Sequence, residues 1–144
     1  MLIEHLSRQF SKRRSTTGLE YELGAPASAQ QLEDFERRCG VILPPSVRRF
    51  YRQHDGLRVT SPSLRILSLN DLALADGRVT FAIFNNSNRM AFETSRTNIA
   101  GEWDIVCAET GFLVTLTMAS FWSNKIFAWI DRRREVWREE FPSE

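Results

Sequence analysis

Two adjacent prolines, Pro44 and Pro45, divide the most strongly patterned stretch of the chain, residues 28–56, into two short helical segments. Proline disfavours helix in the residue before it and suits the first turn of a helix that follows it. Ser28 and Gln31 have the spacing of a capping box, in which each side chain bonds to the other residue's backbone amide. Gly40 stands where a helix end needs a residue that tolerates positive φ. The stretch therefore predicts two helices joined at a fixed angle.

Each half of this stretch carries an apolar stripe at helical spacing. The first stripe comprises Leu32, Phe35 and Cys39, and the second comprises Val47, Phe50, Tyr51 and His54, after which Gly56 ends the helix. The apolar connector 41–43 between them is expected to be buried. Both stripes predict that the helix pair forms one wall of a hydrophobic core.

The segments on either side of the pair predict one more helix before it and strands after it. Apolar residues at 2, 3, 6 and 10 suit a short amphipathic helix that ends at the basic run 11–15. Residues 16–27 read as a linker or extended arm, in which alternating apolar residues allow a short edge strand. Strands are expected at 64–67, 79–84, 89–94, 103–107 and 112–116, the second of them buried on both faces because its apolar run is nearly continuous.

The last segment predicts a long helix over residues 119–140. Its apolar residues fall on one wide helical face, namely Trp122, Ile126, Trp129, Ile130 and Trp137. Helices, then strands, then a helix indicate an α+β fold. We expect a single domain with a mostly antiparallel, or else mixed, sheet of about four to six strands. The N-terminal helix pair and the long C-terminal helix flank it, and the parts are 1–27, 28–56, 57–118 and 119–140.

Charge and cysteine content argue against several classes of protein. The 19 basic and 18 acidic residues give a net charge of +1, which offers no electrostatic argument for nucleic acid or a membrane as partner. Cys39 and Cys107 sit in apolar patterns and read as buried reduced thiols, although a single disulfide stays open. Met1 to Ile3 are followed at once by Glu4, so no secretory leader is indicated, and a cytoplasmic location is expected.

The order of a capped helix, Glu-Arg-Arg-x-Gly-Val-x-Leu-Pro-Pro-Ser and Arg-Arg-Phe-Tyr-x-x-His-x-Gly resembles the opening motif of the SUKH superfamily. That superfamily includes the Smi/Knr-type cell-wall-assembly regulator domain and many bacterial immunity proteins against secreted toxins. The resemblance is specific over residues 28–56 and looser over 65–130. The Gly- and Asp-rich turn that often follows the first long strand in the family is replaced here by 85–88. The resemblance implies the same α+β architecture and a cognate protein toxin, a nuclease or another secreted effector, as partner.

Motifs that carry catalysis or bind metals do not appear in the sequence. His5 and His54 each lie on a helical stripe, far from a second residue at metal-ligand spacing. There is no Gly-x-Ser-x-Gly elbow and no phosphate-binding loop. Cys39 shares its stripe with apolar residues, whereas a nucleophilic cysteine needs a basic and accessible setting. We therefore expect no catalytic residues, no cofactor and no metal, and a binding protein rather than an enzyme.

A polar loop and a few arginine and tryptophan residues are the candidates for binding a partner. Loop tips on a rigid scaffold often carry recognition, and Trp and Arg dominate interface hot spots. The candidate set is Arg58, Asn85, Asn86, Asn88, Arg89, Trp103 and Asp104. A turn that merely needs Asn at positive φ explains the amides equally well. Trp103 is either partly exposed or the first core residue of its strand.

Three functions are compatible with these observations. The first is an immunity protein, monomeric or homodimeric, that blocks a toxin. The second is a regulatory scaffold that binds several partners in cell-envelope or signalling assemblies. The third is a nucleic-acid binder that uses Lys12 to Arg14 and the arginines of the last helix, but interleaved Glu135, Glu139 and Glu140 weaken that field at helical spacing.

Overall fold

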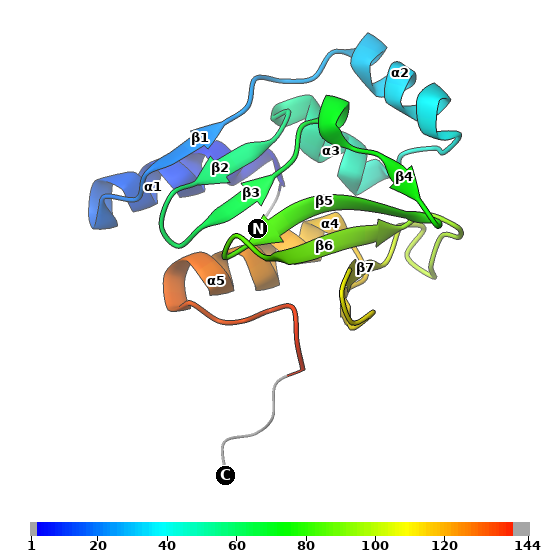
Figure 1. Ribbon diagram of the computed structural model, residues 1–144. Coiled ribbons are helices and arrows are strands. Elements are labelled where there is room, and N and C mark those ends of the chain that lie inside the picture. The colour runs from blue at the N-terminus through cyan, green and yellow to red at the C-terminus, as the bar shows by residue number, and fades with distance from the viewer. Residues whose placement is uncertain (1–2, 140–144) are drawn as a thin grey trace.

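The computed structural model describes residues 3–139 of the chain, and Figure 1 shows the arrangement of its elements. The helical elements are η1 (Ile3–His5), α1 (Leu6–Thr17), α2 (Ala29–Cys39), α3 (Pro45–Gln53), η2 (Leu69–Asp71), α4 (Met118–Ser120), η3 (Phe121–Ile126) and α5 (Phe127–Arg132). The strands are β1 (Tyr21–Leu23), β2 (Leu57–Val59), β3 (Leu64–Ile66), β4 (Leu74–Ala75), β5 (Arg78–Phe84), β6 (Asn88–Glu93), β7 (Ile105–Cys107) and β8 (Leu113–Thr115).

Within the described residues the strands form one eight-stranded sheet in the order β1-β2-β3-β5-β6-β7-β8, with β4 beside β5. Every pairing is antiparallel. The α+β single-domain class is confirmed, but the sheet has more strands than the expected four to six. The extra strands are short: the arm contributes β1, residues 57–59, which are not among the expected strands, form β2, and β4 has two residues. Such short strands carry too few residues to show a period of two.

An aromatic core lies between the sheet and the helices. Figure 1 shows α1, α3 and the α4–α5 segment behind the strands, while the other sheet face is turned to the viewer. Trp122 stacks on Phe50 of α3 with ring centroids 5.3 Å apart, and Phe10 of α1 meets its edge at 6.0 Å. On the strand side, Phe81 stacks on Phe92 at 3.8 Å. Rings from three separate helical segments and two strands therefore interlock.

The first helix of the pair forms as predicted, but the second is shorter than predicted: α3 ends at Gln53, three residues before Gly56, and His54 has an extended backbone with φ −148°. Ser28 and Gln31 make the reciprocal capping box, and Gly40 ends α2 in the left-handed region with φ 66°. The connector departs from the prediction, because Leu43 is buried but Ile42 is 82% exposed. Successive residues of an extended segment point to opposite sides, so only alternate side chains of this run reach the core.

Strand β5 is not buried on both faces as predicted. A bulge between Thr80 and Ala82 shifts the register. Val79, Phe81, Ala82 and Phe84 are buried, whereas Thr80 and Ile83 are half-buried. The bulge places two consecutive residues on the same face, and this accounts for the nearly continuous apolar run.

The C-terminal helix is shorter than the predicted 119–140. It begins as α4, passes through the π-helical turn η3 and ends at Arg132, because Arg133 adopts a left-handed conformation with φ 56°. Trp137 is still buried, packing 5.3 Å from Trp129 and 5.7 Å from Phe84, but it reaches the core from a returning segment. The sequence spacing between Trp122 and Trp137 is compatible with one continuous helix, and equally with a chain that leaves the helix and folds back onto the core. Residue 140 lies outside the described residues.

Candidate functional site: the open face of the sheet

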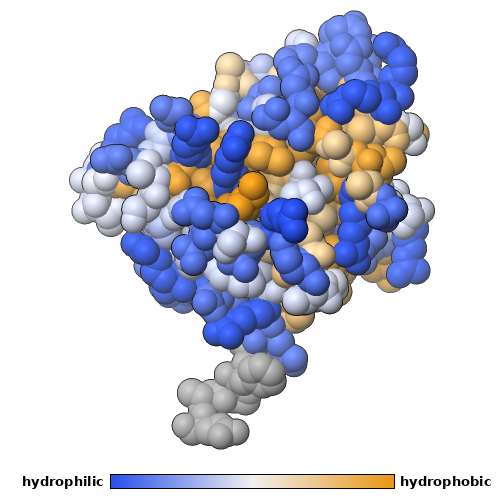
Figure 2. Space-filling model, in the orientation of Figure 1, coloured by the Kyte–Doolittle hydropathy of each residue, from blue (hydrophilic) through white to orange (hydrophobic). Residues whose placement is uncertain are grey.

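The sheet face opposite the helices, called here the open face, carries a row of residues that strand register aligns. Glu22 of β1 lies beside Arg58 of β2, Arg58 beside Arg65 of β3, Arg65 beside Ile83 of β5, and Ile83 beside Arg89 of β6. Figure 2 views this face and shows hydrophobic residues exposed among hydrophilic ones. The row therefore crosses five strands and presents three arginines, on β2, β3 and β6.

The arginines of this row differ in how well they are paired. Arg89 donates from Nε to Oε1 of Glu109 at 2.8 Å, and Arg65 Nη2 lies 3.8 Å from Oδ2 of Asp71. The side chain of Arg58 makes no hydrogen bond or ion pair with any residue between 3 and 139. It stands between Arg65, a like charge that destabilises the pairing, and Glu22, an opposite charge that stabilises it. The face thus holds an exposed guanidinium without a bonded partner in that range.

Burial acts to raise the pKa of the Glu109 carboxyl, but hydrogen bonds from the Arg89 side chain and from nearby backbone amides outweigh it. The net pKa of Glu109 lies below its ordinary value. Glu109 is therefore an anion at neutral pH, and it holds Arg89 at one end of the row.

A shallow hollow of about 620 Å³ lies on the open face beside this row. Its lining combines four alanines with charged side chains; the lining residues are Ala73, Ala75, Asp76, Arg78, Thr80, Arg89, Ala91, Glu93 and Ala108. Within this lining Arg78 donates to Glu93 at 2.5 Å. Ala91 is buried but does not belong to the main core. The volume is within the range of protein binding sites, about 300–1,000 Å³.

The amide-rich loop forms the turn between β5 and β6 at the edge of the open face. Asn85 and Asn86 both have positive φ, 53° and 63°, as a type I′ hairpin turn requires. Asn86 Oδ1 accepts a hydrogen bond from Ser63, and Asn88 donates to the carbonyl of Phe84. The turn explains why these residues are Asn, and Asn85 and Asn86 remain exposed.

Two candidate residues lie away from the row. Trp103 is 3% exposed and packs 5.5 Å from Phe92, so the core interpretation of Trp103 is correct and its side chain is not available to a partner. Asp104 accepts a hydrogen bond from Nδ2 of Asn98 at 2.8 Å. Of the seven candidates, Arg58 and Arg89 share the row and Asn85, Asn86 and Asn88 lie at its edge.

Sequence reasoning missed Arg65, Ile83 and the alanine-lined hollow. A signal for Arg65 exists, because Leu57-Arg58-Val59 and Leu64-Arg65-Ile66 repeat one pattern of an exposed arginine between two buried apolar residues. The hollow has no comparable signal, since it depends on register between strands that are distant in sequence.

The polar residues that end the second helix serve the structure. His54 Nδ1 donates to the carbonyl of Gly24 at 3.2 Å, and Asp55 accepts from the amide of Leu69 at 2.8 Å. Burial lowers the pKa of His54 and the bond to Gly24 partly opposes that. Burial also raises the pKa of Tyr51, with a further rise from the charge of Asp55. These groups fasten the β1 arm and η2 to the helix pair.

Metal and membrane signatures are not found in the described part of the chain. Among residues 3–139 no group of three or more His, Cys, Asp or Glu side chains is placed to hold a metal ion. No helix in that range has the length and apolar character needed to cross a bilayer. Cys39 and Cys107 are both free thiols, the first half-buried and the second buried.

Comparison with known proteins identifies a protein family that this chain matches. A family model described as the SMI1 / KNR4 family (SUKH-1) matches residues 26–143. No curated protein matches the chain.

Proposed function

The chain belongs to the SMI1/KNR4 (SUKH-1) family, and from this premise we propose that it is a non-enzymatic immunity protein that neutralises a cognate secreted bacterial toxin. The family includes proteins with that role. The observation that carries the proposal is the open face, on which Arg58 has no partner among the described residues and opposes Arg65. An exposed guanidinium without an acceptor among the described residues is available to a carboxylate or carbonyl of a bound protein.

The protein acts by covering the toxin. A complex of ordinary size buries about 800 Å² on each partner, and the row together with the hollow offers a continuous surface for such a contact. Arg58 and Arg89 supply the kind of side chain that dominates interface hot spots. The hollow receives a larger side chain of the toxin, because four of its lining residues are alanines, which leave space: Ala73, Ala75, Ala91 and Ala108. Binding of this kind, in the cytoplasm, blocks the toxin's active site or the entrance for its substrate without any catalytic step.

The placement of the titratable groups supports a binding role. His54, Asp55 and Tyr51 are hydrogen-bonded to backbone groups of their own chain. Cys107 is buried in the core. None of these groups faces the hollow on the open face. A protein that binds without catalysis is the function that this arrangement best supports.

The test uses, as the candidate toxin, the protein encoded by the gene next to this one. Cells that express the toxin should grow when the full chain is co-expressed, and the two proteins should elute together on a sizing column. The variant Arg58→Ala/Arg89→Ala should lose both effects. Its matched control is Arg37→Ala/Arg52→Ala, which removes one ion-paired arginine from α2 and, from α3, one arginine whose side chain has no bonded partner among residues 3–139.

Absence of growth rescue together with absence of a complex would contradict the proposal. Equal loss in the face variant and the control would contradict the role of the open face. Recovery of many weakly bound proteins in a pull-down, in place of one tight partner, would instead support a regulatory scaffold.

A further inference from the structure

Two basic segments that are far apart in the sequence meet at one corner of the molecule. Arg13 of α1 donates from Nε and Nη2 to the two carboxylate oxygens of Asp131 of α5, at 2.7 and 2.8 Å, across 118 residues. The guanidinium of Arg13 also lies 3.9 Å above the ring of Phe127. This fork and stacking contact fix the C-terminal turns of α1 and α5 side by side.

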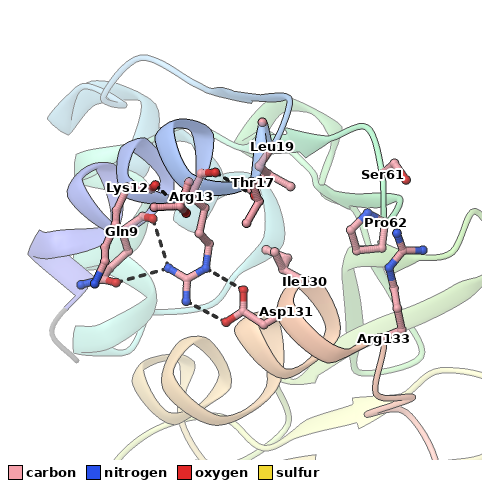
Figure 3. Close-up of a pocket in the computed structure, with 12 residues that line it drawn as sticks. Gln9, Lys12, Arg13, Thr17, Leu19, Ser61, Pro62, Ile130, Asp131 and Arg133 are labelled. Atoms are coloured by element: carbon pink, nitrogen blue, oxygen red, sulfur yellow. Dashed lines mark hydrogen bonds and ion pairs between the residues drawn. The ribbon is translucent and has the colours of Figure 1, made fainter.

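A hollow of about 610 Å³ opens at this corner, between α1, the loop from β2 to β3, and the end of α5. Its apolar lining consists of Leu19, Pro62 and Ile130. Figure 3 shows Arg13 and Asp131 facing each other, with Lys12 on the α1 side and Arg133 beside Pro62 on the other. An extended ligand laid across the hollow therefore meets an apolar floor between two cationic ends.

The charge of the hollow is positive and only partly compensated. Its lining has three cationic side chains, Lys12, Arg13 and Arg133, against the single anion Asp131, which gives a net +2. Neither Lys12 nor Arg133 bonds through its side chain to any residue in the described range. Because α5 ends at Arg132, Arg133 does not pair with the glutamates that follow it in the sequence through helical spacing.

The backbone of Arg133 is unusual for its residue type. Helices α1 and α2 end in the left-handed region at Gly18 and Gly40, with φ 73° and 66°. Helix α5 ends in the same way at Arg133, with φ 56°. A side chain is unfavourable at this position, where glycine carries no penalty. The chain nevertheless presents a guanidinium there, at the wall of the hollow.

We propose that this hollow binds an extended acidic peptide segment of a partner protein. One carboxylate pairs with the fork of Arg133, a second pairs with Lys12, and an apolar side chain between them covers Leu19 and Ile130. Carboxylate suits the site because the neighbouring Arg13 already holds one, Asp131, through two parallel bonds. None of the residues that line this hollow belongs to the row or to the hollow of the open face, so the site goes beyond the proposed toxin contact.

Nucleic acid fits the hollow less well. Sequence-independent binding of single strands relies on exposed aromatic faces for base stacking. The lining of the hollow, as far as the structure describes it, holds no aromatic residue, and Phe127 beneath Arg13 is buried and covered by that guanidinium.

Fluorescence polarisation with the full chain and labelled peptides tests the proposal. The probe is a short peptide of alternating Glu, Leu and Asp, and its control replaces every acid by the matching amide. We expect the acidic peptide to bind much more tightly than the amide peptide. Its affinity should fall as the salt concentration rises to about 0.2 M. A single-stranded oligothymidine is the second probe. No toxin is involved, so failure here is distinct from failure of the proposed immunity role.

Two variants locate the site and one controls for charge. Lys12→Gln and Arg133→Gly should each lower the affinity for the acidic peptide about fivefold to tenfold, because each removes one charge-assisted contact. Arg133→Gly should not lower the thermal midpoint, because glycine suits the left-handed position, so a loss of binding cannot be ascribed to unfolding. Arg52 is an exposed arginine of α3 whose side chain bonds to nothing within the described part of the chain, and Arg52→Gln should leave binding unchanged.

Several results would overturn the proposal. They are equal binding of the amide peptide, no binding of either peptide, unchanged affinity in both site variants, or an equal loss in Arg52→Gln. Tighter, steeply salt-dependent binding of the oligothymidine would assign the corner to nucleic acid instead.

Discussion

The capped helix pair and the open face use their charged side chains in opposite ways. In the helix pair, Glu36 accepts from the amide of Leu43 and from Arg48, both at 2.7 Å, and Arg38 donates to two carbonyls at the ends of η2. On the open face, Arg58 has no partner among the described residues. The sequence motif that is easiest to recognise is therefore structural, and the surface offered to other proteins has little local signature.

The largest effect on stability should come from the core side of the helix pair. Phe50 is fully buried, stacks on Trp122 at 5.3 Å and meets the edge of Tyr51 at 5.0 Å. Phe50→Ala should lower the free energy of unfolding by about 3–5 kcal/mol, because the neighbouring rings cannot close the cavity. Urea denaturation followed by fluorescence measures it. Ile83→Ala on the open face is the contrast and should cost less than about 1.5 kcal/mol, since that side chain is half-buried. Equal costs would erase the distinction between the two regions.

A second effect tests the junction between the helix pair and the sheet. Gly56 has φ 103°, and a Cβ there would lie 2.9 Å from the carbonyl oxygen of Ile66. Gly56→Ala should therefore cost about 2 kcal/mol in unfolding free energy, from backbone strain and steric overlap together. Gly40→Ala separates the two causes, because φ is 66° but the space is open, and it should cost about 1 kcal/mol. Thermal and urea unfolding of both variants would show which substitution lowers the free energy of unfolding more. A larger decrease for the Gly40 variant than for the Gly56 variant would refute this prediction.

The same contrast explains how far the sequence predicts the structure. Helix caps and stripes act over three to seven residues, so the capping box at Ser28 and the left-handed end at Gly40 were predictable. The turn at Asn85 was predictable for the same reason. The pairing of Arg58 with Arg65 and the bulge at Thr80 depend on contacts between strands, which no local spacing encodes.

The end of the last helix shows the same limit. Charged residues of 131–138 fit either a solvated helix face or a chain that leaves the helix and returns. In the structure the chain leaves the helix and returns, and Trp137 is buried against Phe84, which lies more than fifty residues earlier in the sequence. The basic hollow lined by Arg133 follows from that tertiary packing, and so it could not be predicted from the helix pattern.

A smaller effect is expected from pH, and it too belongs to the helix pair. Burial lowers the pKa of His54 below its ordinary value of 6.5, against the opposing bond to Gly24. Between the two pKa values the unfolded chain binds more protons, so stability is complete above about pH 6.5 and falls as the pH drops through the folded pKa. Unfolding free energies measured from about pH 7.5 down to about pH 5.5 should therefore decrease.

The variant His54→Gln should flatten this dependence on pH, whereas His5→Gln, on the exposed side of η1, should not. Carboxylates such as Glu109, whose pKa is lowered, contribute only at more acidic pH and leave this window clear. A slope that survives His54→Gln would show that another group is responsible.

The smallest effect on stability, and the most informative one, is expected at Arg58. Its neighbours in the row are Arg65, a like charge, and Glu22, an opposite one, so Arg58→Gln removes a repulsion and an attraction together. The free energy of unfolding should change by less than about 0.5 kcal/mol. Affinity for the toxin should nevertheless fall at least about tenfold, as expected when an interface loses an anchoring arginine. Calorimetric titration against the toxin, beside Arg52→Gln from the helix side, measures that difference. A large loss of stability at Arg58 would mean that the guanidinium is bonded in the free protein. Unchanged affinity would move the toxin contact off the open face.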